Sequence, residues 1–317
     1  MPATQIQPGY LELLATGELK DRIAKALALL MECTVCPRTC RINRLGEEKG
    51  FCKTGARAKV SSYGPHFGEE PELVGRNGSG TIFFSHCNLA CAYCQNYEIS
   101  QCGYGDEVSA GDIAKMMLSL QRQGCHNINI VSPSHVVPQL LEGLGIAAAG
   151  GLSIPLVYNS GGYDAVETLQ LLAGVVDIYM PDAKYGRDEV ALALSQAPHY
   201  VESMEAALKE MHRQVGDLVV EQGVAARGMI IRHLVLPGNF ADTDRVMKFI
   251  ADELSQDSYV NIMAQYHYPR SLPEQNMITQ DPAYKALLRH ITPKEYRYAI
   301  RCAQNAGLHR GFPAGYL

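Results

Sequence analysis

From residue 80 onward, short apolar and β-branched runs alternate with longer stretches whose apolar positions recur every three or four residues. The short runs predict six strands, at residues 81–85, 127–132, 155–160, 176–181, 228–236 and 260–266. The stretches between them predict helices near residues 109–122, 136–148, 164–173, 189–213 and 241–255. Ser109 can cap the first of these helices, because Asp112 stands three residues later. Strands that alternate with helices indicate an α/β fold with a parallel sheet.

Six strand–helix units are too few to close an eight-stranded barrel, so the pattern predicts an open, partial (β/α)6 TIM-like barrel. The predicted parts of the chain are an N-terminal segment (1–32) with an amphipathic helix over 11–31, a cysteine-rich metal-binding module (33–60), a linker loop (61–79), the partial barrel (80–269) and a C-terminal helical extension (270–317). Ligands of such sheets bind beyond the carboxyl ends of the strands, and we expect the chemistry there.

Composition narrows the class of protein. The chain has 317 residues, 47% of them hydrophobic, which is enough for a sizeable core. No apolar run approaches the roughly 20 residues that span a bilayer, and residues 1–10 lack the pattern of a signal peptide, so we expect a cytoplasmic protein that binds no membrane. A net charge of −5 argues against a nucleic-acid partner. Ten cysteines in such a chain favour metal or redox use over disulfides.

Three cysteines, Cys87, Cys91 and Cys94, follow the first predicted barrel strand in a C-x3-C-x2-C triad. They cannot all pair with one another. They suit three corners of a [4Fe-4S] cluster, which leaves one iron without a protein ligand. A zinc knuckle is the alternative, but it needs a fourth ligand, and His86 is poorly placed for this because it is adjacent to Cys87.

The triad, with Tyr93 before its last cysteine, resembles that of the radical SAM superfamily. Residues 78–84 before the triad, residues 95–96 after it and the segment 66–71 resemble the branch related to pyruvate formate-lyase activating enzyme, the PflX-like proteins. The resemblance extends over residues 33–269 and implies that the open iron binds S-adenosylmethionine (SAM). One-electron reduction of the cluster would then cleave SAM to methionine and a 5′-deoxyadenosyl radical, which takes a hydrogen atom from a substrate.

The resemblance also implies SAM contacts at the strand ends, and Tyr93 is expected to join them. Asn159 lies in a segment similar to the Asn-x-Gly region of the activases, and its amide can bind a carboxylate or a ribose. Asp182 and Lys184 match the family's Asp-x-Lys pair, although an ordinary ion pair at the rim is the alternative. Arg232 lies in a predicted strand and needs an anionic partner, which the SAM carboxylate would supply.

Ser132 follows the second barrel strand, in the segment Ser-Pro-Ser-His at 132–135. The related activases carry Gly-Gly-Glu there, and its backbone meets the amino group of SAM. This chain departs from that pattern. The expected contact of Ser132 with SAM therefore depends on its place at the strand end.

A second group, Cys33, Cys36, Cys40 and Cys52, has the spacing C-x2-C-x3-C-x11-C and indicates a closed metal site. Structural zinc and a second iron–sulfur cluster need the same four thiolates, and the spacing does not decide between them. Structural zinc is slightly favoured because a short module needs a bound metal to stay folded, and metal-free, redox-sensing thiols are the third alternative. Seven basic and two acidic residues between 37 and 60 give this module a charge of +5, typical of a solvated face or of a dock for an acidic flavodoxin or ferredoxin electron donor.

The resemblance thus implies a radical SAM oxidoreductase, activase-like, with a glycyl-radical enzyme as its protein substrate. The cysteine module precedes the triad and the Gly-Gly-Glu is replaced, so a radical SAM enzyme that modifies a small molecule or a protein side chain is equally open. An alternative of another class is a metal-stapled redox-sensor or interaction protein, which would not cleave SAM.

Overall fold

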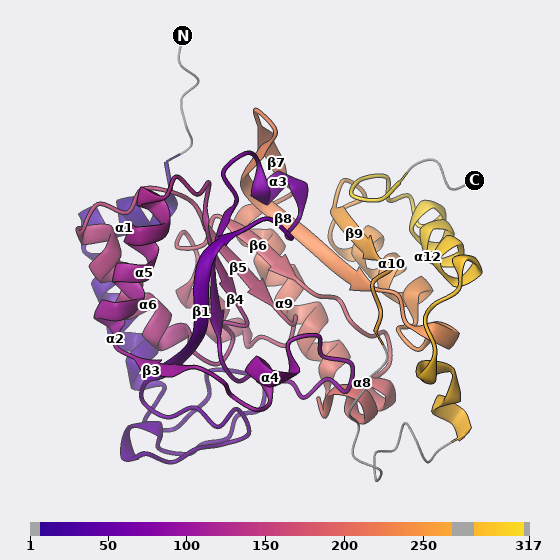
Figure 1. Ribbon diagram of the computed structural model, residues 1–317, viewed down its shortest axis with the longest axis horizontal. Coiled ribbons are helices and arrows are strands. Elements are labelled where there is room, and N and C mark those ends of the chain that lie inside the picture. The colour runs from indigo at the N-terminus through magenta and orange to yellow at the C-terminus, as the bar shows by residue number, and fades with distance from the viewer. Residues whose placement is uncertain (1–6, 268–281, 314–317) are drawn as a thin grey trace.

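A computed structural model describes residues 7–267 and 282–313. Within these residues, nine strands form one sheet in the order β3-β1-β2-β4-β5-β6-β8-β7, and β9 pairs with β8 (Figure 1). The strands are β1 (Ala58–His66), β2 (Ser79–Phe84), β3 (Asp106–Val108), β4 (Ile128–Val131), β5 (Leu156–Ser160), β6 (Ile178–Pro181), β7 (Val219–Glu221), β8 (Val224–Leu234) and β9 (Tyr259–Met263). Strands β2, β4, β5, β6, β8 and β9 run parallel. These six are the predicted barrel strands, and the predicted open, partial barrel is confirmed.

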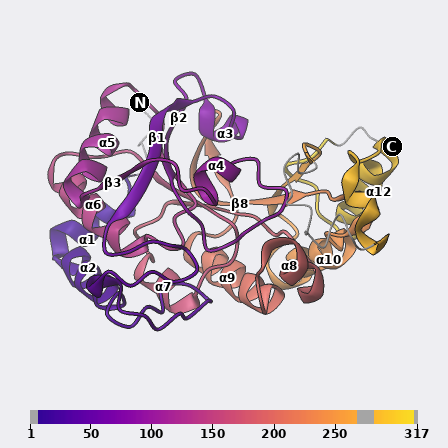
Figure 2. The same cartoon turned by 60° about the horizontal axis from the view of Figure 1, so that its bottom comes forward.

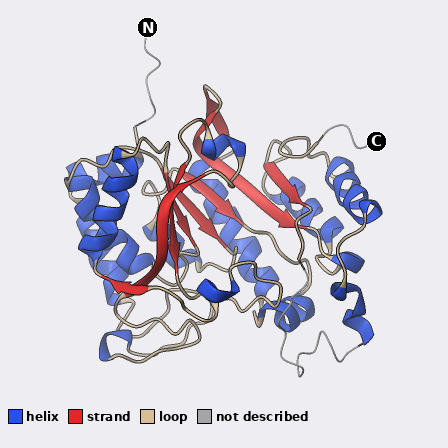
Figure 3. Ribbon diagram, viewed as in Figure 1, coloured by secondary structure: helices blue, strands red, loops and turns tan. Residues whose placement is uncertain are grey.

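Helices surround the sheet, as Figure 3 shows in blue. They are α1 (Gly9–Thr16), α2 (Glu18–Ala28), α3 (Pro71–Val74), α4 (Tyr97–Ser100), α5 (Ala110–Arg122), α6 (Val137–Ala149), α7 (Val166–Leu171), α8 (Asp188–Ser195), α9 (Tyr200–Val215), α10 (Thr243–Glu253) and α12 (Pro293–Asn305), with short 3-10 helices η1 (Arg44–Gly46), η2 (Pro237–Asn239) and η3 (Pro282–Leu288). The predicted capping box of α5 is present, with Ser109 and Asp112 each binding the other's backbone N–H.

Two long helices of the prediction are divided in the structure. The helix expected over 11–31 is α1 and α2, separated at Gly17, whose φ of 82° ends the first helix in the left-handed region. The helix expected over 189–213 is α8 and α9, because Gln196 and His199 both have positive φ and Pro198 lies between them.

The prediction of a loop over residues 61–79 is wrong in two places. Strand β1 runs through residues 58–66 and pairs antiparallel with β2, and α3 follows it at 71–74. Pro65 is tolerated in β1 because the other neighbour, β3, pairs only with residues 58–60, which leaves the proline on a free edge. A half-exposed strand that contains glycine and proline lacks the apolar run by which the barrel strands were identified.

The sheet has two faces of different character. Ile82, Ile130 and Tyr158 belong to the large core between the sheet and its helices, which reaches from Tyr10 to Leu308. The opposite, inner face is closed at its base by Leu73 of α3, in a small apolar cluster that also contains Val157, Ile178, Met180 and Ile230. The inner face is therefore apolar near the amino ends of β5, β6 and β8, with the buried polar side chains of Thr81 and Asn129 beside them on β2 and β4. As described below, it is polar near the carboxyl ends of its strands.

The carboxyl ends of β4, β5 and β6 point toward the bottom of Figure 1, where α4 and the loops of the cysteine-rich module lie. Figure 2, in which this bottom comes forward, shows α4 over the middle of the sheet. Both predicted cysteine groups are thus at the carboxyl edge of the sheet. No helix within the described ranges is long and apolar enough to cross a membrane.

Candidate functional site

The loop that carries Cys87, Cys91 and Cys94 leaves the carboxyl end of β2 and is fastened to the end of α8. The backbone N–H of Ala90 donates to the carbonyl of Ser195 at 3.0 Å, and that of Ala92 donates to the carbonyl of Leu194 at 2.8 Å. These carbonyls are free to accept because the last turn of a helix leaves them without intrahelical partners. A helix end about 100 residues further along the chain therefore fixes the shape of this loop.

Hydrogen bonds reach each sulfur of the triad. Ser195 donates its hydroxyl to Cys91 Sγ at 2.9 Å, and the Leu89 N–H donates to Cys87 Sγ at 3.4 Å. Cys94 Sγ lies 3.1 Å from Ser100 Oγ. Burial, with the nearby Cys91 sulfur, raises the pKa of the Cys87 thiol to about 12. A buried sulfur of this kind becomes a thiolate when a metal centre takes the place of its proton, so the donor set fits an iron–sulfur cluster.

A layer of charged side chains lies beside the triad at the carboxyl ends of the inner face. Asp182 is at its centre: its Oδ2 is 2.5 Å from Lys184 Nζ, and its Oδ1 accepts from Arg232 Nε at 2.8 Å. Arg232 also donates to Asn159 Oδ1 at 2.7 Å and lies 3.8 Å from Glu69 Oε2. The structure thus brings together four of the six residues that were predicted to contact SAM.

The charges in this layer stabilise one another. Burial alone would raise the pKa of Asp182, but Arg232 and Lys184 outweigh it and the net pKa is lowered. Burial likewise opposes the charge of Lys184, whose pKa is nevertheless raised by Asp182 and by the Cys91 sulfur. Lys184 therefore joins the charged layer to the triad. Arg232 was predicted to need an anionic partner, and Asp182 and Glu69 supply it within the protein.

The two other predicted SAM contacts, Tyr93 and Ser132, are not members of the ion-pair network, although the backbone of Ser132 is bonded to that of Asn159. The Tyr93 hydroxyl is 2.5 Å from that of Tyr185, and its ring packs on Tyr266 with centroids 5.7 Å apart. Only 7% of Tyr93 is exposed. Ser132 has a φ of 58°, a left-handed conformation that is rare outside glycine, and its N–H donates to the Asn159 carbonyl at 2.9 Å. Backbone strain of this kind is frequent at functional sites.

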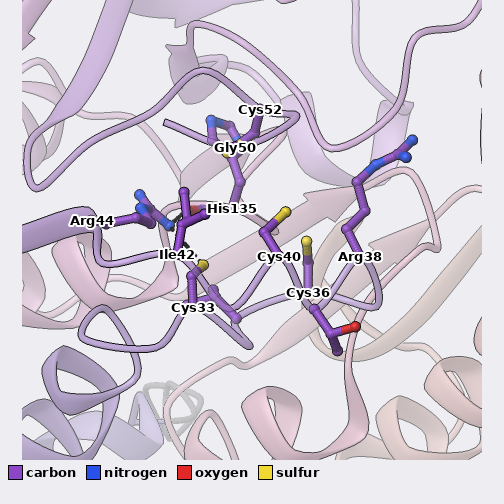
Figure 4. A pocket seen from close by; sticks show the side chains of 11 residues that line it. Cys33, Cys36, Arg38, Cys40, Ile42, Arg44, Gly50, Cys52 and His135 are labelled. Atoms are coloured by element: carbon purple, nitrogen blue, oxygen red, sulfur yellow. Dashed lines mark hydrogen bonds between the residues drawn. The ribbon is translucent and has the colours of Figure 1, made fainter. Parts of the chain in front are cut away.

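The second cysteine group lines one pocket, shown in Figure 4, in which the sulfurs of Cys36 and Cys40 lie close together. Cys33 and Cys52 line the same pocket. Across residues 7–267 and 282–313, no three histidine, cysteine, aspartate or glutamate side chains are already arranged as a metal site, and this applies to both cysteine groups. The metal site at the four cysteines stays a prediction.

Buried basic side chains connect the two cysteine groups. Arg44 is 1% exposed and donates to the carbonyls of Gly55 and His135, with Cys33 Sγ 3.8 Å away. The His135 ring is buried, which lowers its pKa to about 3, and its Nε2 lies 3.1 Å from the carbonyl of Ser85 at the end of β2. His135 thus holds the cysteine-rich module against the strand that leads to the triad.

Arg38 makes the second connection. Its Nε donates to the carbonyl of Asn88, next to Cys87, at 2.6 Å, and its guanidinium stacks 3.2 Å above the centre of the Phe51 ring. Two of the seven basic residues in the cysteine-rich module, Arg38 and Arg44, are therefore engaged inside the protein. The exposed basic surface of the module is smaller than its composition predicts.

The contributions of Glu69, Ser195 and Arg38 to the site could not be recognised from the sequence. Each acts through a partner that lies at least 50 positions away along the chain. The only available signal was the segment 66–71, which resembles the PflX-like branch and which we interpreted as a structural turn.

The comparison with protein families agrees with the triad. The sequence pattern of the radical SAM superfamily matches residues 81–250. Uncharacterized protein MJ0674 of Methanocaldococcus jannaschii is 33% identical over 307 residues, which cover 92% of this chain and 79% of that protein. The crystal structure of HydG, a maturase of the [FeFe]-hydrogenase, matches 71% of this chain with 12% identity and a TM-score of 0.43. The match covers 49% of HydG, so this chain spans about half the length of HydG.

The superfamily pattern covers more than half of the chain and contains Cys87, Cys91 and Cys94 as well as the strands that carry Asn159 and Asp182. This chain belongs to the radical SAM superfamily, whose members are enzymes that use a [4Fe-4S] cluster and SAM.

Proposed function

We propose that Cys87, Cys91 and Cys94 hold the [4Fe-4S] cluster of this enzyme and that SAM binds between the cluster and the charged layer around Asp182. Together, the bound cluster and SAM supply a 5′-deoxyadenosyl radical that abstracts hydrogen from a substrate. The observation that carries the proposal is the position of Lys184. Its ammonium group is mostly buried, is paired with Asp182 and lies near enough to Cys91 for the sulfur to raise its pKa.

Lys184 is the best candidate for a direct contact with the carboxylate of SAM. An ammonium group has three N–H donors, and within residues 7–267 and 282–313 Lys184 Nζ has a single hydrogen-bond partner, Asp182 Oδ2. Arg232 already bridges Asp182 and Asn159 by hydrogen bonds and lies 3.8 Å from Glu69. Its role in this proposal is therefore to hold Asp182, which in turn orients Lys184.

The substrate is the finer part of the proposal. Resemblance to the PflX-like branch favours an activase-like enzyme that acts on a glycyl-radical enzyme. One observation favours a small polar substrate instead. Asn129 is completely buried on the inner face, one layer below Asn159, and neither polar atom of its amide has a hydrogen-bond partner in the described part of the chain. An unpaired buried amide costs about 1–3 kcal/mol, which a polar molecule inside the barrel would offset.

A metal ion or cluster at Cys33, Cys36, Cys40 and Cys52 is also part of the proposal. Its support is Arg44, a buried cation to which the described residues offer no carboxylate partner. Buried charges are costly unless they are paired, and metal-bound thiolates would supply the missing negative charge. A flavodoxin or ferredoxin-type donor would approach the exposed basic residues Arg41, Lys49, Lys53 and Arg57.

Anaerobic reconstitution tests the proposal. Iron, sulfide and zinc would be measured in the wild type, in a Cys87→Ala/Cys91→Ala/Cys94→Ala variant and in Cys125→Ala, a buried cysteine outside both groups. We expect loss of four irons and of 5′-deoxyadenosine formation from SAM and dithionite in the triad variant alone. Zinc or iron that remains in the triad variant would identify the metal at the second cysteine group. A wild type without iron at the triad would refute the proposal.

The two substrate classes can be separated with the same assay. Formation of 5′-deoxyadenosine would be compared after addition of the low-molecular-mass and the macromolecular fractions of a cell extract. Stimulation by the low-molecular-mass fraction, lost in Asn129→Ala, supports a small polar substrate. Stimulation by the macromolecular fraction alone supports the activase-like reaction.

A further inference from the structure

Three buried hydroxyl groups form a chain that ends on the sulfur of Cys91. The Ser195 hydroxyl donates to Cys91 Sγ at 2.9 Å, the Tyr185 hydroxyl lies 2.6 Å from Ser195 Oγ, and the Tyr93 hydroxyl lies 2.5 Å from that of Tyr185. Ser195 and Tyr185 are completely buried, and Tyr93 is 7% exposed. The chain closes a ring, because Tyr93 and Cys91 belong to the same loop.

The direction of the chain follows from the number of protons. A hydroxyl group has one proton to donate and two lone pairs that accept. Because Ser195 gives its proton to Cys91, it must accept from Tyr185, and Tyr185 must then accept from Tyr93. All three O–H dipoles point toward the sulfur. Aligned hydrogen bonds in a low-dielectric interior polarise and strengthen one another.

Among the residues that the structure describes, no such chain reaches the other two sulfurs. Cys87 accepts from a backbone N–H, that of Leu89, at the longer distance of 3.4 Å. Cys94 is paired with Ser100, which is partly exposed and can serve as donor or acceptor. Cys91 is therefore the ligand at which buried protein dipoles are aligned in one direction.

We propose that Ser195, supported by Tyr185 and Tyr93, raises the reduction potential of the cluster at the triad. Reduction adds negative charge to the cluster and its sulfurs, and hydrogen bonds to the sulfurs stabilise that charge. This inference rests on the proposed function, because it requires a cluster at Cys91. It gives Tyr93 a positioning role behind Ser195 in place of the cofactor contact expected from the resemblance.

A redox titration tests the inference. The anaerobic, reconstituted full chain would be titrated and the reduced cluster followed by electron paramagnetic resonance, with the signal of the triad assigned as the one absent from the Cys87→Ala/Cys91→Ala/Cys94→Ala variant. In Ser195→Ala we expect the equilibrium constant for one-electron reduction to fall about tenfold, a shift of about 59 mV to a more negative potential. Ser195→Thr keeps the hydroxyl and should keep the potential.

Two tyrosine variants provide a graded readout. Tyr185→Phe and Tyr93→Phe leave the Ser195 hydroxyl in place and remove the dipoles behind it, so smaller shifts of the same sign are expected. Tyr10→Phe is the matched control, because Tyr10 is also completely buried and donates its hydroxyl to the Ile154 carbonyl, far from the triad along the chain. Its potential should equal that of the wild type.

The outcomes separate the two proposals. Unchanged potentials in Ser195→Ala and Tyr185→Phe, with four irons retained at the triad, would overturn the inference and leave the proposed function intact. A wild type without the triad signal would overturn both. If Ser195→Ala does not hold its cluster, Tyr185→Phe decides the question on its own, because it keeps the hydrogen bond to the sulfur.

Discussion

Arg232 donates a 2.8 Å hydrogen bond to Asp182 across the adjacent strands β6 and β8, although 50 positions separate the two residues in the sequence. The bond lies where β6 ends, and the same carboxylate pairs with Lys184. Only 15–17% of these side chains is exposed. One carboxylate therefore pairs with two buried cations, and removing it leaves Lys184 without its partner and Arg232 with only the more distant Glu69, at 3.8 Å.

We expect Asp182→Ala to lower the free energy of unfolding by about 3–5 kcal/mol, the usual cost of leaving buried charges unpaired. Urea unfolding measures this loss. Glu253→Ala is the control, because the ion pair of Glu253 with Lys209 is exposed and should be worth less than about 1 kcal/mol. An Asp182→Ala protein that unfolds at the same urea concentration as the wild type would contradict the buried network.

Lys184→Met is expected to weaken SAM binding at least tenfold. A hydrogen bond to a charged group contributes about 1.5–3 kcal/mol, and the variant removes the spare donors next to the triad. Equilibrium dialysis of SAM with reconstituted protein measures the change. Lys115→Met, at an exposed helical lysine paired with Asp112, should bind SAM like the wild type. Equal affinities in both variants would place the carboxylate of SAM elsewhere.

Gly162 is expected to tolerate no side chain. Its φ is 75°, and a Cβ there would collide with the carbonyl oxygen of Asp182. Gly162→Ala should therefore cost more than about 2 kcal/mol of stability, through the strained backbone and the displaced strand end. Gly151→Ala is matched in its positive φ of 94° but meets no atom within 4 Å, so about 1 kcal/mol is expected. Thermal unfolding of the two variants separates collision from backbone strain.

The stability of the fold should depend on pH through Asp177. Burial raises the pKa of this carboxyl from 3.8 to about 6, although the N–H groups of Gly9 and Leu156 donate to it. The folded state thus binds the proton more tightly than the unfolded state. Its contribution is fully present below about pH 4 and is lost as pH rises through about 6, up to about 3 kcal/mol in all.

Urea unfolding at several pH values tests this dependence. In Asp177→Asn, the decrease between about pH 4 and pH 6 should be smaller than in the wild type, because that position no longer titrates. An identical pH profile in both proteins would mean that Asp177 is ionised in the fold at its ordinary pKa.

The barrel strands could be predicted because parallel strands are buried on both faces and are therefore continuous apolar runs, as in Thr81-Ile82-Phe83-Phe84. The triad and the Asp182–Lys184 pair could be predicted because their residues are close in the sequence. Strand β1 could not, since it contains Gly64 and Pro65 and is half-exposed.

Long-range contacts account for the rest of the site. Glu69 meets Arg232, and Ser195 meets Cys91, through packing of elements far apart in the chain. No local pattern of a serine at a helix end indicates which sulfur it will face. The burial of Arg44 could not be predicted for the same reason. The basic composition of the cysteine-rich module suggested that its arginines lie on the surface, whereas Arg44 is buried.

The attachment of the triad loop to α8 has a consequence for the order in which the enzyme matures. Synthesis runs from the amino end, so Cys94 leaves the ribosome about 100 residues before Leu194 and Ser195, whose carbonyls hold the loop. Until then, the N–H groups of Ala90 and Ala92 lack their acceptors. Under the proposed function, iron and sulfide would therefore be delivered to a chain that has already been completed through α8, and a nascent fragment that ends before α8 would be a poor recipient for them.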